Sequence, residues 1–163
     1  MLVEAAEIQT HHKILEPSAG SGAIVDYISS NYNIQPRDID CVELNKEKYE
    51  ILRSKHYNSF HWEFLSFATD KNYHEKYDRI IACPPFKKNI DIAHIESMYG
   101  LLKTGGILVS LTSPLWITNN EEHQVKFREW LADKDYSMKM LPENSYIEDY
   151  KSVPTMIIKI YKK

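Results

Sequence analysis

A strand-like segment followed by a glycine turn is the first place in this sequence that could do chemistry. Residues 13–16 form a candidate strand, and Pro17–Gly22 has the sequence Pro-Ser-Ala-Gly-Ser-Gly before helical spacing begins at Ala23. Glycines let a ligand approach the backbone closely, and the N–H groups at the start of a helix are available to it. This order favours a ligand-binding edge at the carboxyl end of a sheet, although an ordinary strand–helix turn has the same pattern.

Two acidic residues narrow the choice of ligand. Glu43 ends the next predicted strand, 21 residues after Gly22, which is close to the offset of about 20 at which an acid meets ribose hydroxyls in nucleotide-binding folds. A carboxylate can accept hydrogen bonds from both hydroxyls of a cis-diol. Glu16, just before the glycines, would repel a pyrophosphate but attract an ammonium group. We therefore expect a cationic nucleoside rather than a dinucleotide; the alternative for Glu43 is a solvated strand end.

The second candidate site is the turn Cys83–Phe86, which follows the apolar run Ile80–Ala82. Its two prolines stiffen the backbone and leave carbonyl groups exposed, and the ring of Phe86 offers a stacking face. An isolated Pro-Pro pair is more simply a strand terminator beside a packed Phe. The functional interpretation is favoured here because the turn follows the fourth strand of a predicted nucleoside-binding sheet.

These two sites need a parallel sheet to bring them together. Short apolar runs alternate with helical patterns, which indicates an α/β fold with right-handed crossovers. The expected strands are 13–16, 39–43, 60–64, 77–83, 107–112, 137–141 and 155–161. The expected helices are 2–8, one beginning at Ala23, 46–55, 90–102 and 122–133. Gly105 and Gly106 should turn the chain into the fifth strand, and a closing hairpin would make the last strand antiparallel.

The composition limits the class of protein. The chain has 163 residues, of which 43% are hydrophobic and 26% charged, enough for one sizeable core. The 20 Lys and Arg against 23 Asp and Glu give a net charge of −3, which disfavours a nucleic-acid coat or a polybasic membrane binder.

No apolar run approaches the roughly 20 residues of a membrane helix, and the N-terminus has no signal-peptide pattern. Cys41 and Cys83 are too few for a disulfide scaffold and lack metal-site spacing. We expect a reduced, cytoplasmic protein without a metal.

The two motifs together resemble a known family. Glu16–Ala23 and Cys83–Phe86, with Glu43 between them, are similar to motifs of the class I S-adenosylmethionine-dependent methyltransferases. Within these, the chain most resembles the amino methyltransferases, which include adenine-N6 DNA enzymes and their phage and plasmid relatives. The resemblance runs from Ile14 to about Thr112. It implies one Rossmann-like domain over residues 1–163, without a target-recognition domain. The implied sheet is mostly parallel and seven-stranded, in the order 3-2-1-4-5-7-6 with the last strand antiparallel and helices on both faces.

The resemblance implies S-adenosylmethionine as the cofactor and gives each motif a role. The residues that would line its methionine part are Glu16, Pro17, Ser18, Ala19, Gly20 and Gly22. Glu43 would hold the ribose, and Leu44 would pack beside the adenine. Glu63 would lie near the adenine amino group, with Phe64 against the ring. The catalytic residues, which would hold the amine to be methylated, are Cys83, Pro84, Pro85 and Phe86.

Cys83 departs from the family pattern, which has Asn or Asp at this position. That side-chain oxygen accepts one hydrogen bond from the target amine, while a backbone carbonyl accepts the other. Sulfur is a weak acceptor, and losing one such bond in the transition state costs about 3 kcal/mol, roughly a hundredfold in rate. A covalent role for Cys83, as in cytosine-C5 methyltransferases, is disfavoured because the cysteine of those enzymes follows a proline. Cys41, inside an apolar strand, is expected in the core.

The predicted function is methyl transfer to the exocyclic amine of a nucleobase, of the DNA adenine-N6 type. Two alternatives stay open: a weak or inactive cofactor-binding relative or subunit, and an enzyme acting on a protein amide or a small molecule. We expect weak nucleic-acid binding by the chain alone, a partner subunit as one source of target recognition, and no membrane binding. Lys87 and Lys88 are expected in a solvated loop, and Tyr146 and Tyr150 lie in a loop that either covers the site or only joins two strands.

Overall fold

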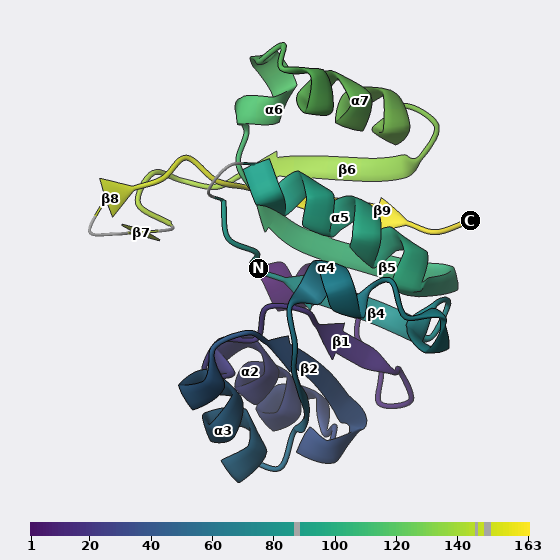
Figure 1. The fold of residues 1–163 in the computed structure, drawn as a ribbon, viewed down its shortest axis with the longest axis vertical. Helices are drawn as coiled ribbons and strands as arrows, with labels where there is room; N and C mark the ends of the chain where they lie inside the picture. Colours follow the sequence, from purple (N-terminus) through teal and green to yellow (C-terminus); the bar gives the residue numbers. More distant parts are fainter. Residues whose placement is uncertain (87–88, 146, 149–150) are drawn as a thin grey trace.

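A seven-stranded sheet forms the centre of this computed structural model, which describes residues 1–86, 89–145, 147–148 and 151–163 (Figure 1). In spatial order its strands are β3 (Asn58–His61), β2 (Ile39–Glu43), β1 (Ile14–Glu16), β4 (Tyr77–Ala82), β5 (Leu102–Thr112), β9 (Met156–Tyr161) and β6 (Asp135–Met140). Strands β1 to β5 pair in parallel, and β9 is antiparallel to both β5 and β6. The predicted order, with the seventh strand antiparallel, is confirmed.

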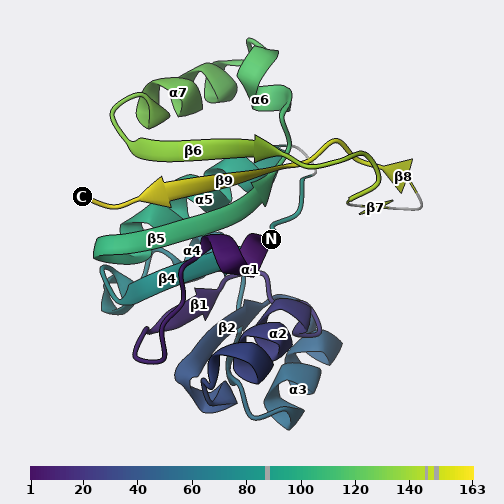
Figure 2. The same ribbon diagram turned by 180° about the vertical axis from the view of Figure 1, so that it is seen from behind.

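Helices cover both faces of this sheet. They are α1 (Leu2–Ala5), α2 (Ala23–Tyr32), α3 (Lys46–Ser54), α4 (Phe64–Phe67), α5 (Ile90–Leu101), α6 (Leu115–Thr118) and α7 (Glu122–Leu131), with 3₁₀ turns at Pro36–Asp38 and Lys71–Tyr73. Helix α5 lies in front of β5 in Figure 1, whereas Figure 2 shows α1 against the opposite face.

Two apolar clusters hold these layers together. Successive strand residues point to opposite faces, so Ile80 and Ala82 join one cluster and Ile81 joins the other. The first cluster packs the sheet against α4, α5, α6 and α7, and the second packs it against α1, α2 and α3. The end of β4, residues 80–82, is buried and forms a continuous apolar run, whereas the preceding strand residues Asp78 and Arg79 are charged.

The third strand lies elsewhere than predicted. We expected it over 60–64, but β3 covers Asn58–His61, and Phe64 is the first residue of α4. The side chain of Glu63 accepts hydrogen bonds from the backbone N–H groups of Leu65 and Ser66. A carboxylate in this position caps a helix, so the chain turns into α4 directly after β3.

Three further segments differ from the prediction. Strand β5 begins at Leu102, so Gly105 and Gly106 lie inside it rather than before it. Gly105 has a φ of +79°, and a Cβ on Gly106 would lie 2.8 Å from the carbonyl oxygen of Lys103, so this irregular strand start needs both glycines. Helix α6 was not predicted. The segment predicted as a polar loop contains the short pair β7 (Ile147–Glu148) and β8 (Lys151–Ser152).

The predictions for Lys87, Lys88, Tyr146 and Tyr150 concern residues outside those that the structure describes. Within the described part of the chain, the helices are too short or too polar to cross a membrane.

Candidate functional site

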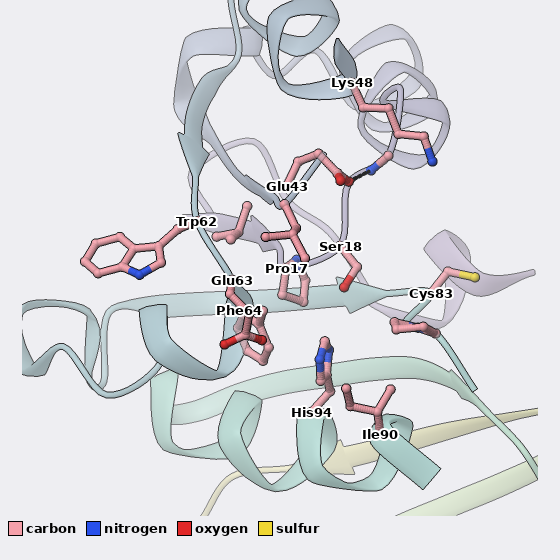
Figure 3. Close-up of a pocket in the computed structure, with 14 residues that line it drawn as sticks. Pro17, Ser18, Glu43, Lys48, Trp62, Glu63, Phe64, Cys83, Ile90 and His94 are labelled. Atoms are coloured by element: carbon pink, nitrogen blue, oxygen red, sulfur yellow. Dashed lines mark hydrogen bonds between the residues drawn. The ribbon is translucent and has the colours of Figure 1, made fainter. Parts of the chain in front are cut away.

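Most of the predicted site residues line one cavity of about 440 Å³ at the carboxyl ends of β1, β2 and β4 (Figure 3). Because these strands are parallel, the segments that follow them leave the sheet at the same edge. The predicted residues that line the cavity are Pro17, Ser18, Gly20, Glu43, Leu44, Glu63, Phe64, Cys83 and Pro85. The predicted residues outside its lining are Glu16, Ala19, Gly22, Pro84 and Phe86.

The two glycines of the first turn have different structural roles. Gly20 lines the cavity with a φ of +55°, and a Cβ added there would meet nothing within 4 Å. Gly22, with a φ of +96°, caps the start of α2, and its Cβ would lie 3.0 Å from the Leu52 side chain of α3. Gly20 therefore keeps the backbone open to a ligand, while Gly22 lets α2 and α3 pack closely.

Glu43 joins the loops that follow β1 and β2. Its Oε2 accepts the backbone N–H of Gly20 at 2.7 Å, and its Oε1 accepts that of Asn45 at 2.7 Å. Asn45 in turn caps α3 by accepting the N–H of Lys48. A carboxylate has about four lone-pair sites, so about two remain for ligand hydroxyls. This leaves Glu43 able to hold a cis-diol at the cavity wall.

Glu16 lies behind the turn rather than at the cavity. Its side chain is 2% exposed, and its Oε2 has no hydrogen-bond partner among the described residues. Burial raises the pKa of Glu16 well above its usual range, against the opposing effect of a hydrogen bond from the backbone of Val25 in α2. In this position the carboxyl group contacts the first turn of α2 and is not part of the cavity lining.

Glu63 and Phe64 form the wall next to Leu44. The two oxygens of Glu63 accept from Leu65 N at 2.9 Å, from Ser66 N at 2.8 Å and from Ser66 Oγ at 3.0 Å. Burial alone would raise the pKa of Glu63, but these hydrogen bonds outweigh burial and lower it. Phe64 is 3% exposed, whereas Leu44 is 65% exposed at the rim. A flat ligand between these two side chains would cover the exposed leucine.

The Cys83–Phe86 turn forms another wall. Cys83 is half-buried and Pro85 is exposed, and both line the cavity. Pro84 is buried and Phe86 is half-buried outside the lining. The strand β4 ends at Ala82, where the prolines stop the ladder, and Cys83 begins the turn.

Sequence reasoning missed five residues of the lining, which are Val42, Lys48, Trp62, Ile90 and His94. Lys48 and Trp62 lie near motif residues in the sequence, Trp62 directly before Glu63. Ile90 and His94 lie four residues apart on α5, so one face of that helix carries both. The spacing does not tell a helix face that lines a cavity from one that packs in the core, so it could not single out His94.

His94 is the one of these five with an unusual environment. Its side chain is 4% exposed, and its ring centroid lies 4.8 Å from that of Phe64 at an angle of 51°. Burial lowers the pKa of His94 to about 4, only partly offset by the charge of Glu63. Its Nδ1 has no hydrogen-bond partner within the described part of the chain.

Comparisons with known proteins show the fold. No protein-family profile and no curated protein matches the sequence. A structure described as the modification subunit of a type I restriction enzyme from Vibrio vulnificus YJ016 superposes with a TM-score of 0.76 at 14% identity, over 97% of this chain and 42% of that one. Geranyl diphosphate C-methyltransferase from Streptomyces coelicolor A3(2) gives 0.71 at 12%, over 99% and 77%. Precorrin-6y C5,15-methyltransferase from Geobacter metallireducens GS-15 gives 0.66 at 16%, over 99% and 86%.

The chain therefore spans less than half of the restriction-enzyme subunit and most of the other two proteins. At these identities the likeness establishes the architecture, a Rossmann-like sheet of the kind found in class I methyltransferases, with its seventh strand antiparallel.

Proposed function

We propose that this chain is an S-adenosylmethionine-dependent methyltransferase that acts on an amino nitrogen, the exocyclic amine of a nucleobase of the DNA adenine-N6 type. The observation that carries the proposal is the convergence of three motifs, far apart in the sequence, on one cavity. These are the glycine turn at Gly20, the acid Glu43, and the turn that begins at Cys83.

The residues of the cavity suit such a cofactor. Gly20 leaves open space beside the backbone, and Glu43 keeps about two acceptor positions for ribose hydroxyls. Leu44 and Phe64 supply apolar surface for a purine. When bound, S-adenosylmethionine supplies a methyl group that is activated by a positively charged sulfur. Among the solved structures with this fold, one is a complex with AdoMet and another contains S-adenosyl-L-homocysteine.

The Cys83–Phe86 turn would hold and orient the target amine. Its prolines fix the backbone, so a carbonyl group can accept one amine hydrogen and turn the nitrogen lone pair toward the cavity. Cys83 is among the residues that line the cavity, and the motif resemblance gives it the place of the oxygen acceptor for the second hydrogen. Its sulfur accepts weakly, so we infer slow transfer, with positioning as the main contribution of the chain.

The same cysteine favours a second candidate, a cofactor-binding relative or subunit with little activity of its own. The solved structures with this fold include proteins as different as a restriction-enzyme subunit and a geranyl diphosphate C-methyltransferase. A protein amide or a small molecule therefore stays an alternative target. A partner subunit, as the word "modification subunit" implies for the Vibrio protein, would be one source of target recognition.

Two measurements test these proposals in order. Calorimetric titration with S-adenosylmethionine and S-adenosylhomocysteine should show binding, and its absence from folded protein would overturn the methyltransferase proposal. Transfer of a radiolabelled methyl group to DNA, RNA, protein extract and small-molecule extract then separates the targets. Label in adenine of DNA supports the first proposal, label elsewhere supports the alternative target, and binding without label supports the cofactor-binding subunit. Lys126→Ala, on the exposed face of α7, serves as a control variant.

A further inference from the structure

His94 is a buried polar side chain aimed into the cavity, and the three motifs do not account for it. It projects from α5 between Phe64 and Ile90 (Figure 3). The side chain is 4% exposed, and its Nδ1 has no partner among the described residues. A buried ring nitrogen without a hydrogen bond is unfavourable, so a cavity ligand that brought a polar group to this nitrogen would stabilise the site.

The imidazole is in the form that can accept a hydrogen bond. Because burial lowers the pKa of His94 to about 4, the ring is neutral at pH 7. A neutral imidazole has one N–H donor and one acceptor nitrogen, whereas a charged ring has only donors. Its neighbours in the cavity are the ring of Phe64 and the carboxylate of Glu63, whose negative charge acts on the histidine. An approaching amino group would therefore find an acceptor in this ring.

Glu63 acts as the cap of helix α4. Its oxygens already take three hydrogen bonds from the first turn of α4, two from backbone N–H groups and one from the Ser66 hydroxyl. These bonds hold the carboxylate against the helix that it caps. Most lone pairs of the Glu63 carboxylate already accept hydrogen bonds, so a base packed on Phe64 would find little acceptor capacity there. The acceptor nitrogen of His94 has its lone pair available.

We propose that His94 accepts a hydrogen bond from the amino group of the cofactor's adenine and so selects a 6-aminopurine, while Glu63 acts as a helix cap. This rests on the proposed function, because it names a residue that recognises the proposed cofactor. The sequence resemblance gave the contact with the adenine amino group to Glu63; the proposal gives it to His94 on α5.

The test is a comparison of two probes by calorimetry. One is S-adenosylhomocysteine, and the other is its analogue in which the purine lacks the 6-amino group. The wild-type protein should bind the analogue more weakly by about 5- to 10-fold, the effect of one net hydrogen bond. His94→Phe should bind both probes equally, and His94→Gln, which keeps an acceptor, should retain part of the preference. Thermal unfolding establishes that each variant is folded.

Glu63→Ser is the matched control. Serine also caps helices well, so this variant keeps α4 but removes the carboxylate from the cavity, and it should keep the full preference for the amino group. A preference that survives His94→Phe, or that disappears in Glu63→Ser, overturns the assignment to His94. Equal binding of both probes by the wild type also overturns it while leaving the proposed function intact. Failure of the wild type to bind S-adenosylhomocysteine overturns both.

Discussion

Each carboxylate oxygen of Glu43 already accepts one backbone N–H, from Gly20 and from Asn45. The side chain therefore does two things at once: it ties together two loops at the sheet edge and presents acceptors to the cavity. Cys83 lines the same cavity, and in the proposed reaction its contribution depends on how well its sulfur accepts a hydrogen bond. Substitutions at these two residues should change different quantities, cofactor affinity at Glu43 and transfer rate at Cys83.

Glu43→Ala should weaken binding of S-adenosylhomocysteine by about 1.5–3 kcal/mol, the range for a hydrogen bond to a charged group. Calorimetric titration measures this directly. The matched control is Asn45→Ala, which removes the cap of α3 but keeps the carboxylate. It should lower the free energy of unfolding by about 1 kcal/mol and leave affinity nearly unchanged. An unchanged dissociation constant in folded Glu43→Ala would remove Glu43 from the site.

Cys83→Asn should raise the rate of methyl transfer and leave cofactor affinity nearly unchanged, because an amide oxygen is a better acceptor than sulfur for the target amine. The gain should approach a hundredfold, the rate equivalent of about 3 kcal/mol. Single-turnover transfer of labelled methyl measures it, and Cys83→Ala should stay near the wild-type rate. If Cys83→Ala instead abolishes transfer, the cysteine is a nucleophile. If none of the three forms transfers methyl, the chain only binds the cofactor.

Residues of helices α3, α4 and α5 line the cavity, and the packing of α2 against α3 supports its wall. Helices α2 and α3 meet at Gly22, and α5 brings Ile90 and His94 to the wall. The start of α5 is tied to the end of β5, because Asp91 accepts hydrogen bonds from Thr112 Oγ1 at 2.7 Å and from Ser113 N at 2.9 Å. Asp91 is 1% exposed, so this link lies in the interior. The cavity therefore depends on helix packing as much as on the motif residues themselves.

Substitution of the two motif glycines should separate helix packing from ligand access. Gly22→Ala combines an unfavourable φ with contact against Leu52, so its free energy of unfolding should fall by about 2–3 kcal/mol. Gly20→Ala meets open space and should cost only the left-handed backbone, about 1–2 kcal/mol. Urea unfolding measures both. Gly20→Val should in addition weaken cofactor binding, because its side chain projects toward the cavity. Equal destabilisation by the two alanine variants would contradict the packing role of Gly22.

At the scale of the whole molecule, several buried titratable groups couple stability to pH. Burial lowers the pKa of His94, and it raises the pKa of Glu16 and of Asp91. A buried histidine disfavours folding as pH falls, because only the unfolded chain takes up the proton. The two buried carboxyl groups act in the opposite direction, since the folded chain holds their protons more tightly. The net profile is a difference between these effects, so one group is isolated only by comparing variants.

His94→Phe should flatten part of the pH dependence of stability. The pKa of His94 is about 4 in the folded protein against 6.5 for an ordinary histidine. Between these values the unfolded state binds the extra proton, so this group contributes a loss of up to about 1.4 kcal/mol per pH unit as the pH falls. The stability of His94→Phe relative to the wild type should therefore rise as the pH falls from about 6.5 toward 4. Urea unfolding across this range measures the difference, and a constant difference would show that the ring titrates normally.

The order of elements is largely readable from the sequence. Strands β2 and β4 contain the short apolar stretches 41–42 and 80–82, and the turns after β1 and β4 are marked by glycines and prolines. Parallel pairing then places the residues that follow these strands at a common edge, which is why Gly20, Glu43 and Cys83 could be expected to meet.

Which side chains reach the cavity was decided only by the tertiary structure. Glu16 lies inside the glycine motif, yet its carboxyl group is buried near Val25 of α2. Glu63 looked like the end of a strand, and it caps α4. His94 lies in the middle of a helix whose apolar periodicity gave no reason to single it out, and it lines the cavity beside Phe64. Periodicity reports which face of an element is buried, but not whether that face meets apolar packing, a backbone N–H or an open space. That depends on how α2, α4 and α5 pack on the sheet, and so on contacts between residues far apart in the chain.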